Sequence, residues 1–350
     1  MMNLLLKMLD IELPIIQAPM AGVQGSALAA AVSGAGGLGS LPCAMLDVEA
    51  VRSEMSVIRQ HTMKPVNLNF FCHTMPQADV QLETKWRSQL GRYYRQYGID
   101  EQSLKTGAVR TPFTESSLRL LAELTPAVVS FHFGLPEEKL LDSVKALGIK
   151  ILASATTVQE ALWLENRGVD AIIAQGIEAG GHRGMFLSTD LATQMGTFSL
   201  LPQIVHAVGL PVIAAGGVAD AQGVRAALDL GASAVQMGTA FLLCSECNTS
   251  VLHREALMSE AAGHTAITNV FSGRPARSIV NRLVSELGPI NEQVPAFPLA
   301  GAGTAQLRSL AEKEGCADFT PLWCGQNASG CKEISATELV RELAQGAQTD

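Results

Sequence analysis

The chain has 350 residues, a length that accommodates either one large α/β domain or two smaller ones. Hydrophobic residues make up 47% of it, enough for a sizeable core, and a formal net charge of -8 offers no basic surface for nucleic acid or an anionic membrane. We expect a cytoplasmic protein with reduced cysteines, because no secretory signal or apolar run of roughly 20 residues is apparent. A homo-oligomer is compatible with the sequence.

Eight short apolar or β-branched runs alternate along the chain with helical patterns. The predicted strands are 14–20, 36–42, 65–71, 128–134, 150–156, 171–176, 211–217 and 234–239. The predicted helices between them are 26–35, 48–62, 137–147, 158–167, 198–208 and 221–230. Strand–helix alternation implies right-handed parallel crossovers, and eight such units predict a closed (β/α)8 barrel, the TIM barrel fold. An open doubly wound sheet is the alternative, but it seldom needs eight near-equal units.

Two stretches interrupt this repeat, one after the third predicted strand and one after the eighth. The predicted division is a barrel from residues 1–75 and 108–247, a helical insertion and cap from 76–107 and 248–325, and a C-terminal segment, 326–350. Within that last segment, residues 334–346 are amphipathic. We expect them to dock on the barrel as a helix.

A formal G-x-G-x-x-G pattern occurs at Gly34, Gly36 and Gly39. The dinucleotide-binding fingerprint requires a strand before these glycines and a helix after them. Here a predicted helix precedes them and a predicted strand follows, so the order is reversed. We therefore interpret the glycines as a helix end and a tight entry into a strand.

Polar side chains gather toward the C-terminal ends of the predicted strands. Asn67 and Asn69 lie two residues apart and hence on one face of their strand. His132, Thr156 and Gln175 also lie late in their strands. A single residue of this kind can simply satisfy another amide inside the barrel. Their shared position is more informative, because active sites of this fold lie at that end.

Glycines follow the seventh and eighth predicted strands. Gly216 and Gly217 end "AAGG", and Gly238 and Thr239 end "QMGT". Glycine lets backbone N–H groups approach an anion, and loops after strands 7 and 8 commonly hold phosphate in this fold. Two ordinary turns are the alternative, but both glycine sites fall where the phosphate site is expected.

The stretch "IIAQGIEAGGHRG" (172–184) begins as a buried strand and continues into flexible backbone around the titratable His182. Glu178, His182 and His132 lack a clear further carboxylate, so we expect no metal site. Cys244 and Cys247 have redox or metal spacing, but a lone pair favours inert thiols.

Several motifs, in their order and spacing, resemble the nitronate monooxygenases, the 2-nitropropane dioxygenase-like flavoproteins. They are "PIIQAPMAG", "AGGLGS", "NLNFF", "SFHFGLP", "EAGGHRG", "VIAAGGVAD", "AVQMGTAFL", "NVFSGRPARSIVNRL" and "LWCGQ", so the resemblance covers nearly the whole chain. Flavin-dependent enoyl-thioester reductases share the "EAGGH" loop and the glycine strands. "SFHFGLP" looks more like the monooxygenase branch.

The resemblance implies FMN bound in a TIM barrel, with His182 as the catalytic residue. His132 is expected to share the substrate pocket. The positions that the resemblance assigns to the cofactor are Met20, Asn69, Gln175, Gly180, Gly217, Gln236, Met237, Gly238 and Thr239. Among these, Gly217 and the 236–239 turn would receive the phosphate.

The implied activity is the oxidation of alkyl nitronates by O2 to a carbonyl compound and nitrite. His182 would hydrogen-bond a nitronate oxygen or take the α-proton of a neutral nitroalkane. The first alternative is a reductase on the same scaffold that uses NAD(P)H to reduce an enoyl thioester or a quinone. The second is a non-catalytic flavin-binding protein.

Overall fold

The computed structural model describes residues 3–101, 104 and 110–348, and within them eight parallel strands form a nearly closed barrel. The strands are β1 (Ile15–Gln17), β2 (Gly39–Pro42), β3 (Val66–Phe71), β4 (Val128–His132), β5 (Lys150–Ala155), β6 (Ala171–Gln175), β8 (Val212–Ala215) and β9 (Ala234–Met237). They pair in the order β1-β9-β8-β6-β5-β4-β3-β2, and a bridge between Ile16 and Leu38 joins the two ends. The predicted TIM barrel and its eight strands are therefore confirmed.

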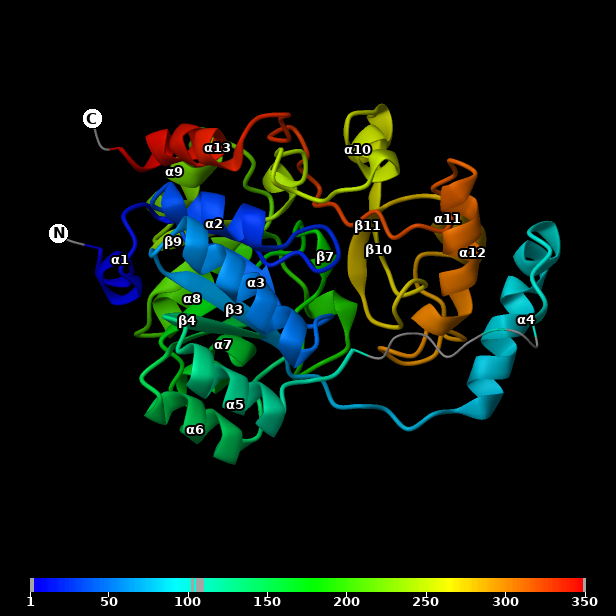
Figure 1. Ribbon diagram of the computed structural model, residues 1–350, viewed down its shortest axis with the longest axis horizontal. Helices are drawn as coiled ribbons and strands as arrows, with labels where there is room; N and C mark the ends of the chain where they lie inside the picture. Colours follow the sequence, from blue (N-terminus) through cyan, green and yellow to red (C-terminus); the bar gives the residue numbers. More distant parts are fainter. Residues whose placement is uncertain (1–2, 102–103, 105–109, 349–350) are drawn as a thin grey trace.

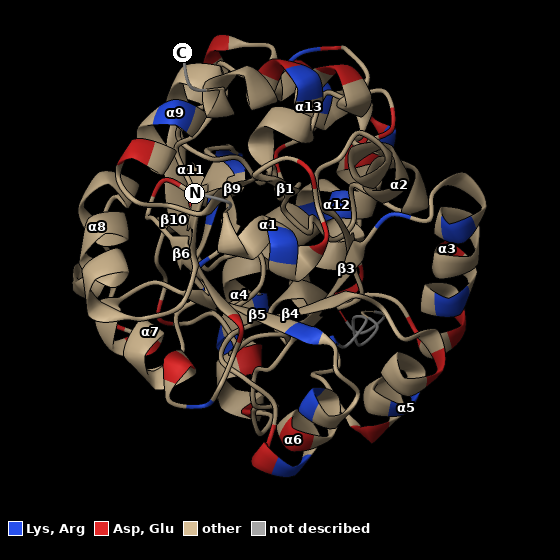
Figure 2. Ribbon diagram, turned by 90° about the vertical axis from the view of Figure 1, so that its left-hand side faces the viewer, with Lys and Arg blue, Asp and Glu red and all other residues tan. Residues whose placement is uncertain are grey.

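Helices surround the barrel and follow its strands in turn (Figure 2). They are α2 (Ser26–Gly34), α3 (Val48–His61), α5 (Glu115–Leu124), α6 (Glu138–Ala146), α7 (Val158–Glu165), α8 (Thr197–Ala207) and α9 (Ala221–Asp229). Helix α13 (Ala336–Ala344) packs against α2 and α9. Its buried residues Ala336, Leu339, Val340 and Leu343 recur at helical spacing, which explains why this segment lies on the barrel.

The short helix α1 (Leu4–Leu9) closes one end of the barrel. Leu5 and Leu9 are buried in one cluster with strand residues from the barrel interior, among them Ile16, Leu152 and Ile213. Figure 2 looks onto this end and shows α1 across its middle. A ligand can therefore approach the barrel interior only from the opposite end, where the strands finish.

The reversed order at the G-x-G-x-x-G pattern is confirmed. Gly34 ends α2, and Gly39 begins β2. A Cβ on Gly39 would overlap the carbonyl oxygen of Ala29, so glycine is needed there for close contact between helix and strand.

The insertion and the cap contain a second hydrophobic core. They comprise α4 (Val80–Gln96), α10 (Val251–Leu257), β10 (Thr265–Thr268), β11 (Ala276–Ile279), α11 (Arg282–Leu287) and α12 (Gly301–Lys313), placed at one end of the barrel (Figure 1). Trp86 and Tyr94 of α4 are buried with Val270, Leu307 and Phe319 of the cap. On this basis we propose that insertion and cap form one unit.

A three-stranded antiparallel sheet joins this cap to the barrel, and it was not predicted from the sequence. Strand β11 pairs with β10 on one side and with β7 (Gly181–His182) on the other. Ala276 is the direct partner of His182. Short 3-10 turns complete the described elements, at Leu191–Thr193, Thr239–Phe241, Glu260–Gly263 and Gln345–Ala347. None of the helices in the described ranges is both long and apolar enough to traverse a lipid bilayer.

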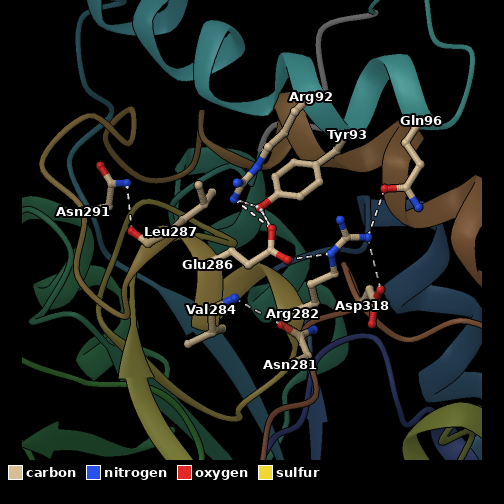
Figure 3. Close-up of polar contacts among 10 residues, drawn as sticks. All are labelled: Arg92, Tyr93, Gln96, Asn281, Arg282, Val284, Glu286, Leu287, Asn291 and Asp318. Carbon is tan, nitrogen blue, oxygen red and sulfur yellow. Dashed lines mark hydrogen bonds and ion pairs between the residues drawn. The ribbon is translucent and has the colours of Figure 1, made fainter.

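Polar contacts fix α4 against α11 (Figure 3). The Glu286 carboxylate accepts a hydrogen bond from the Tyr93 hydroxyl at 2.8 Å and pairs with Arg92 and Arg282, each at 2.8 Å. Hydrogen bonds from Arg282 and Tyr93 lower the pKa of Glu286. Since these charged groups are about a third exposed or more, we expect them to orient the two helices rather than to contribute much stability.

Candidate functional site

A cavity lies where the barrel strands end, opposite α1. It is lined by every residue predicted for the site: Met20, Asn69, His132, Gln175, Gly180, His182, Gly217, Gln236, Met237, Gly238 and Thr239. The structure thus brings together residues from six barrel strands, β1, β3, β4, β6, β8 and β9, and from the loops that follow them. Their individual roles stay predictions.

The glycines at one side of this cavity have backbone conformations and contacts that exclude larger residues. Gly216 and Gly217 have φ values of 107° and 77°, in the left-handed region. A Cβ on Gly216 would lie 2.9 Å from the Ala179 nitrogen, and a Cβ on Gly180 would lie 2.6 Å from the Gly325 nitrogen. The loop after β6 therefore packs closely between the end of β8 and Gly325, the last residue of the cap.

The carboxylate of Glu178, in this loop, is hydrogen-bonded within the protein. Its carboxylate accepts hydrogen bonds from the Thr197 backbone N–H and hydroxyl, each at 2.9 Å. Across the residues that the structure describes, no three His, Cys, Asp or Glu side chains are placed to hold a metal ion. Glu178 thus serves to anchor the loop to the start of α8.

Gln175 and Arg183 attach the His182 loop to β6. Gln175 donates to the His182 carbonyl oxygen at 3.0 Å and accepts from the Gly184 N–H at 2.7 Å. The fully buried Arg183 guanidinium donates to the Gln175 and Gly176 carbonyl oxygens, each at 2.7 Å. Because both ends of its amide hold the loop, Gln175 acts on His182 as well as lining the cavity.

We expect Arg183→Met to lower the free energy of unfolding by about 2–5 kcal/mol, because the guanidinium's hydrogen bonds to the Gln175 and Gly176 carbonyl oxygens and to the Gln194 side chain are lost. Urea unfolding measures this change. Arg92→Met is the matched control: its side chain is 50% exposed, so its loss should cost no more than about 1 kcal/mol. Equal losses in the two variants would show that the buried hydrogen bonds of Arg183 contribute nothing.

His182 lies in an aromatic enclosure that the cap completes. The ring centroids of Phe71, Phe133, Phe297 and Trp323 lie 6.2, 5.9, 5.3 and 5.4 Å from that of His182. Burial lowers the pKa of His182 well below its usual value, and the positive charge of Arg110 lowers it further, as do other cationic neighbours. A lowered pKa favours the neutral imidazole, the form that can accept a proton.

His132 holds the backbone of His182. Its Nδ1 lies 3.0 Å from the Ser154 hydroxyl and its Nε2 lies 3.2 Å from the His182 carbonyl oxygen. Burial lowers the pKa of His132 to about 3. Both ring nitrogens have protein partners, so the geometry gives His132 a supporting position, and its contact with substrate stays a prediction.

Two buried polar atoms at the cavity have no partner in the described structure. They are Oε1 of Gln236 and Nε2 of His253. Unpaired buried polar atoms are rare in proteins and are expected where a ligand or water completes the bonding. Together with the glycines, these atoms make the cavity suited to a polar cofactor.

Several residues of the site were missed from the sequence. Ser272, whose hydroxyl lies 2.8 Å from Nε2 of His182, comes from the cap. Its signal was its place within "NVFSGRPARSIVNRL", one of the motifs of the resemblance. Phe297 and His253 also come from residues 248–325 and had no local pattern that pointed to the cavity. Arg110 was missed as well: it lines the cavity, and its guanidinium lies 5.7 Å from the Phe297 ring centroid.

Comparisons with known proteins agree with this architecture. Residues 2–346 match the family model described as nitronate monooxygenase. Nitronate monooxygenase of Paraburkholderia phytofirmans is 44% identical over 97% of this chain and 93% of the relative. That of Pseudomonas aeruginosa is 43% identical over 97% of each chain.

Solved structures show the same relationship. The chain is similar to nitroalkane oxidase from Streptomyces ansochromogenes, with 38% identity, a TM-score of 0.88 and 98% of each chain covered. FabK from Thermotoga maritima is more distant, with 27% identity, a TM-score of 0.72, and 98% of this chain and 94% of FabK covered. These values disfavour the reductase alternative. The chain belongs to the nitronate monooxygenase family of enzymes.

Proposed function

We propose that this enzyme binds FMN in the cavity at the strand ends and oxidises alkyl nitronates with O2 to a carbonyl compound and nitrite. The observation that carries this proposal is the His182 imidazole, which is enclosed by aromatic rings and lines a cavity with unpaired polar atoms. This position makes His182 the base that we propose for the reaction.

The residues present fit a flavin mononucleotide. Gly217, Gly238 and Thr239 offer backbone N–H groups for one phosphate, and the chain shows no second glycine-rich site for an adenylate. Gln236 and His253 offer polar atoms that a cofactor can pair. When bound, the flavin supplies the electron transfer and the oxygen chemistry.

The protein's own groups bind and orient the substrate. His182 takes the α-proton from a neutral nitroalkane, and the protonated ring can then hydrogen-bond an oxygen of the nitronate that forms. Arg110 lines the same cavity, and burial lowers its pKa without neutralising it, so its positive charge favours an anionic nitronate. Phe71 and Trp323 keep the site dry, which strengthens these electrostatic interactions.

The absorbance spectrum of the purified protein, followed anaerobically, tests the proposed activity. Adding an alkyl nitronate should bleach the flavin bands, whereas adding NADPH should leave them unchanged. Bleaching by NADPH alone would instead support the reductase, and no bleaching by either reagent would support a non-catalytic flavin protein.

The flavin released by heat should be FMN rather than FAD, because the cavity provides for one phosphate. Reversed-phase chromatography against both standards measures this. FAD in the released fraction would contradict the single-phosphate assignment, as would the absence of flavin after reconstitution with FMN.

Gly217→Val should weaken FMN binding about tenfold or more. A β-branched residue strains the backbone at a φ of 77° and places side-chain atoms beside the phosphate position. Fluorescence titration of the apoprotein with FMN measures the effect. Gly148→Val is the matched control: Gly148 has a φ of 73° and open space around it, and it does not line the cavity. Equal FMN affinity in both variants would place the phosphate elsewhere.

A further inference from the structure

The Ser272 hydroxyl lies between the His182 ring and a backbone carbonyl oxygen, and its hydrogen bonds bear on where the ring carries its proton. The Ser272 side chain is buried, and its hydroxyl lies 2.8 Å from Nε2 of His182. The same hydroxyl donates to the carbonyl oxygen of Arg274 at 3.2 Å. A serine hydroxyl has a single proton, which Ser272 can give either to the Arg274 carbonyl oxygen or to Nε2 of His182. The carbonyl oxygen can only accept, and we infer the arrangement that satisfies both contacts: Ser272 donates to Arg274 and accepts from His182. The neutral ring then carries its proton on Nε2.

The other nitrogen of the ring is open to the cavity. Nδ1 of His182 has no hydrogen-bond partner in the part of the chain that the structure describes. It is also not one of the solvent-inaccessible polar atoms that lack a partner, such as Nε2 of His253. His182 itself lines the cavity. With the proton on Nε2, Nδ1 presents a free lone pair to whatever binds there.

Further contacts fix the backbone of His182 and the segment that contains Ser272. Gln175 and His132 both contact the His182 carbonyl oxygen. The Arg274 guanidinium lies 3.9 Å from the Phe133 ring centroid and donates a hydrogen bond to the Met185 carbonyl oxygen. These contacts fix Arg274, whose own carbonyl oxygen accepts from Ser272. The acceptor, the serine and the imidazole therefore form one chain of hydrogen bonds that ends in the cavity.

We propose that Ser272 is a positioning residue that keeps the His182 proton on Nε2 and makes Nδ1 the base that takes the α-proton of a neutral nitroalkane. This inference rests on the proposed function. In the step, the substrate C–H bond breaks, its electron pair remains on the substrate as the nitronate, and the proton moves to Nδ1. The resulting imidazolium keeps its Nε2–H bond to Ser272, which stabilises the new charge.

Ser272→Ala removes the acceptor and should lower kcat/KM for a neutral nitroalkane by about 10–100-fold, since the imidazolium loses a hydrogen bond. The loss should lie in kcat, with KM nearly unchanged, and nitronate oxidation should change by less than about threefold, because a nitronate needs no base. The kinetic pKa of the base should fall in this variant. The other groups that act on it, Arg110, Arg274, His132 and His73, are unaltered.

The proton position can be measured directly, without reference to activity. Long-range 1H–15N correlation spectra of histidine-labelled, flavin-loaded enzyme report which ring nitrogen carries the proton, and His182→Asn assigns the signal. We expect wild type to show a proton on Nε2, Ser272→Ala to lose this preference, and Ser272→Thr, which keeps the hydroxyl, to restore it. A wild-type proton on Nδ1 would overturn the proposal, even if the enzyme oxidises nitronates.

Ser33→Ala is a matched control for loss of a buried hydroxyl. Ser33 is fully buried, donates to the Pro65 carbonyl oxygen at 2.7 Å and accepts from the Gly39 N–H at 3.0 Å, and it does not line the cavity. Its loss should lower stability and leave the His182 spectrum unchanged. If Ser272→Ala behaves like Ser33→Ala in spectrum and pH profile, Ser272 has only a structural role. Failure of wild type to oxidise nitronates would contradict the proposed function alone.

Discussion

His182→Asn should retain its flavin and lose oxidation of neutral nitroalkanes by about 10²–10⁴-fold, the usual worth of a positioned general base. A neutral nitroalkane must first lose its α-proton, whereas a nitronate is already an anion. Nitronate oxidation needs binding and orientation only, so it should fall less steeply. In the structure this difference rests on the His182 imidazole, which is half-buried beside Phe133, Phe297 and Trp323 and whose pKa is lowered by loss of solvent.

Oxygen consumption with each substrate, normalised to bound flavin, measures the two losses. Normalisation matters because loss of cofactor would lower both rates together. His206→Asn is the matched control: His206 lies exposed on α8 and does not line the cavity. If His182→Asn oxidises both substrates at wild-type rates, His182 is an ordinary loop residue.

The barrel was predictable because its evidence is local. Each strand of a parallel barrel is buried on both faces, so runs such as 171–176 and 211–217 are apolar throughout and are bounded by helical patterns. The strand-end glycines were predictable for a similar reason. Gly216 and Gly217 adopt positive φ values that few other residues tolerate, so their position in the chain already indicates a special backbone.

The cap side of the site was not predictable, because it depends on pairing between distant segments. Strand β7 has two residues, too few to give any alternating pattern, and it forms only because β11 pairs with it. The same pairing brings Ser272 to His182. Phe297 reaches the cavity from a segment without regular periodicity, so its local sequence gives no indication of its neighbours.

Acidification from about pH 6.5 to 4 should destabilise the enzyme, since four histidines, two buried and two half-buried, have lowered pKa values in the folded state. Burial lowers the pKa of His73 and His253 to about 4 each, that of His132 to about 3, and that of His182 well below its usual value. In the unfolded chain each histidine binds its proton near pH 6.5. Between these pKa values the unfolded state holds more protons, so stability rises with pH and is lost as pH falls.

Each such histidine contributes up to about 1.4 kcal/mol per pH unit to this slope, so the combined effect over two units amounts to several kcal/mol. Urea unfolding of flavin-loaded enzyme at pH 7.5, 6.0 and 5.0, at constant free flavin, measures it. His253→Phe should reduce the change of unfolding free energy per pH unit by the contribution of one histidine. It removes a buried imidazole whose Nε2 has no protein partner among the described residues. His206→Phe, at an exposed position, should leave the slope unchanged. A stability that does not vary between pH 7.5 and 5.0 would mean that these histidines are hydrated in the folded enzyme, and His182 would then lose its status as a desolvated base.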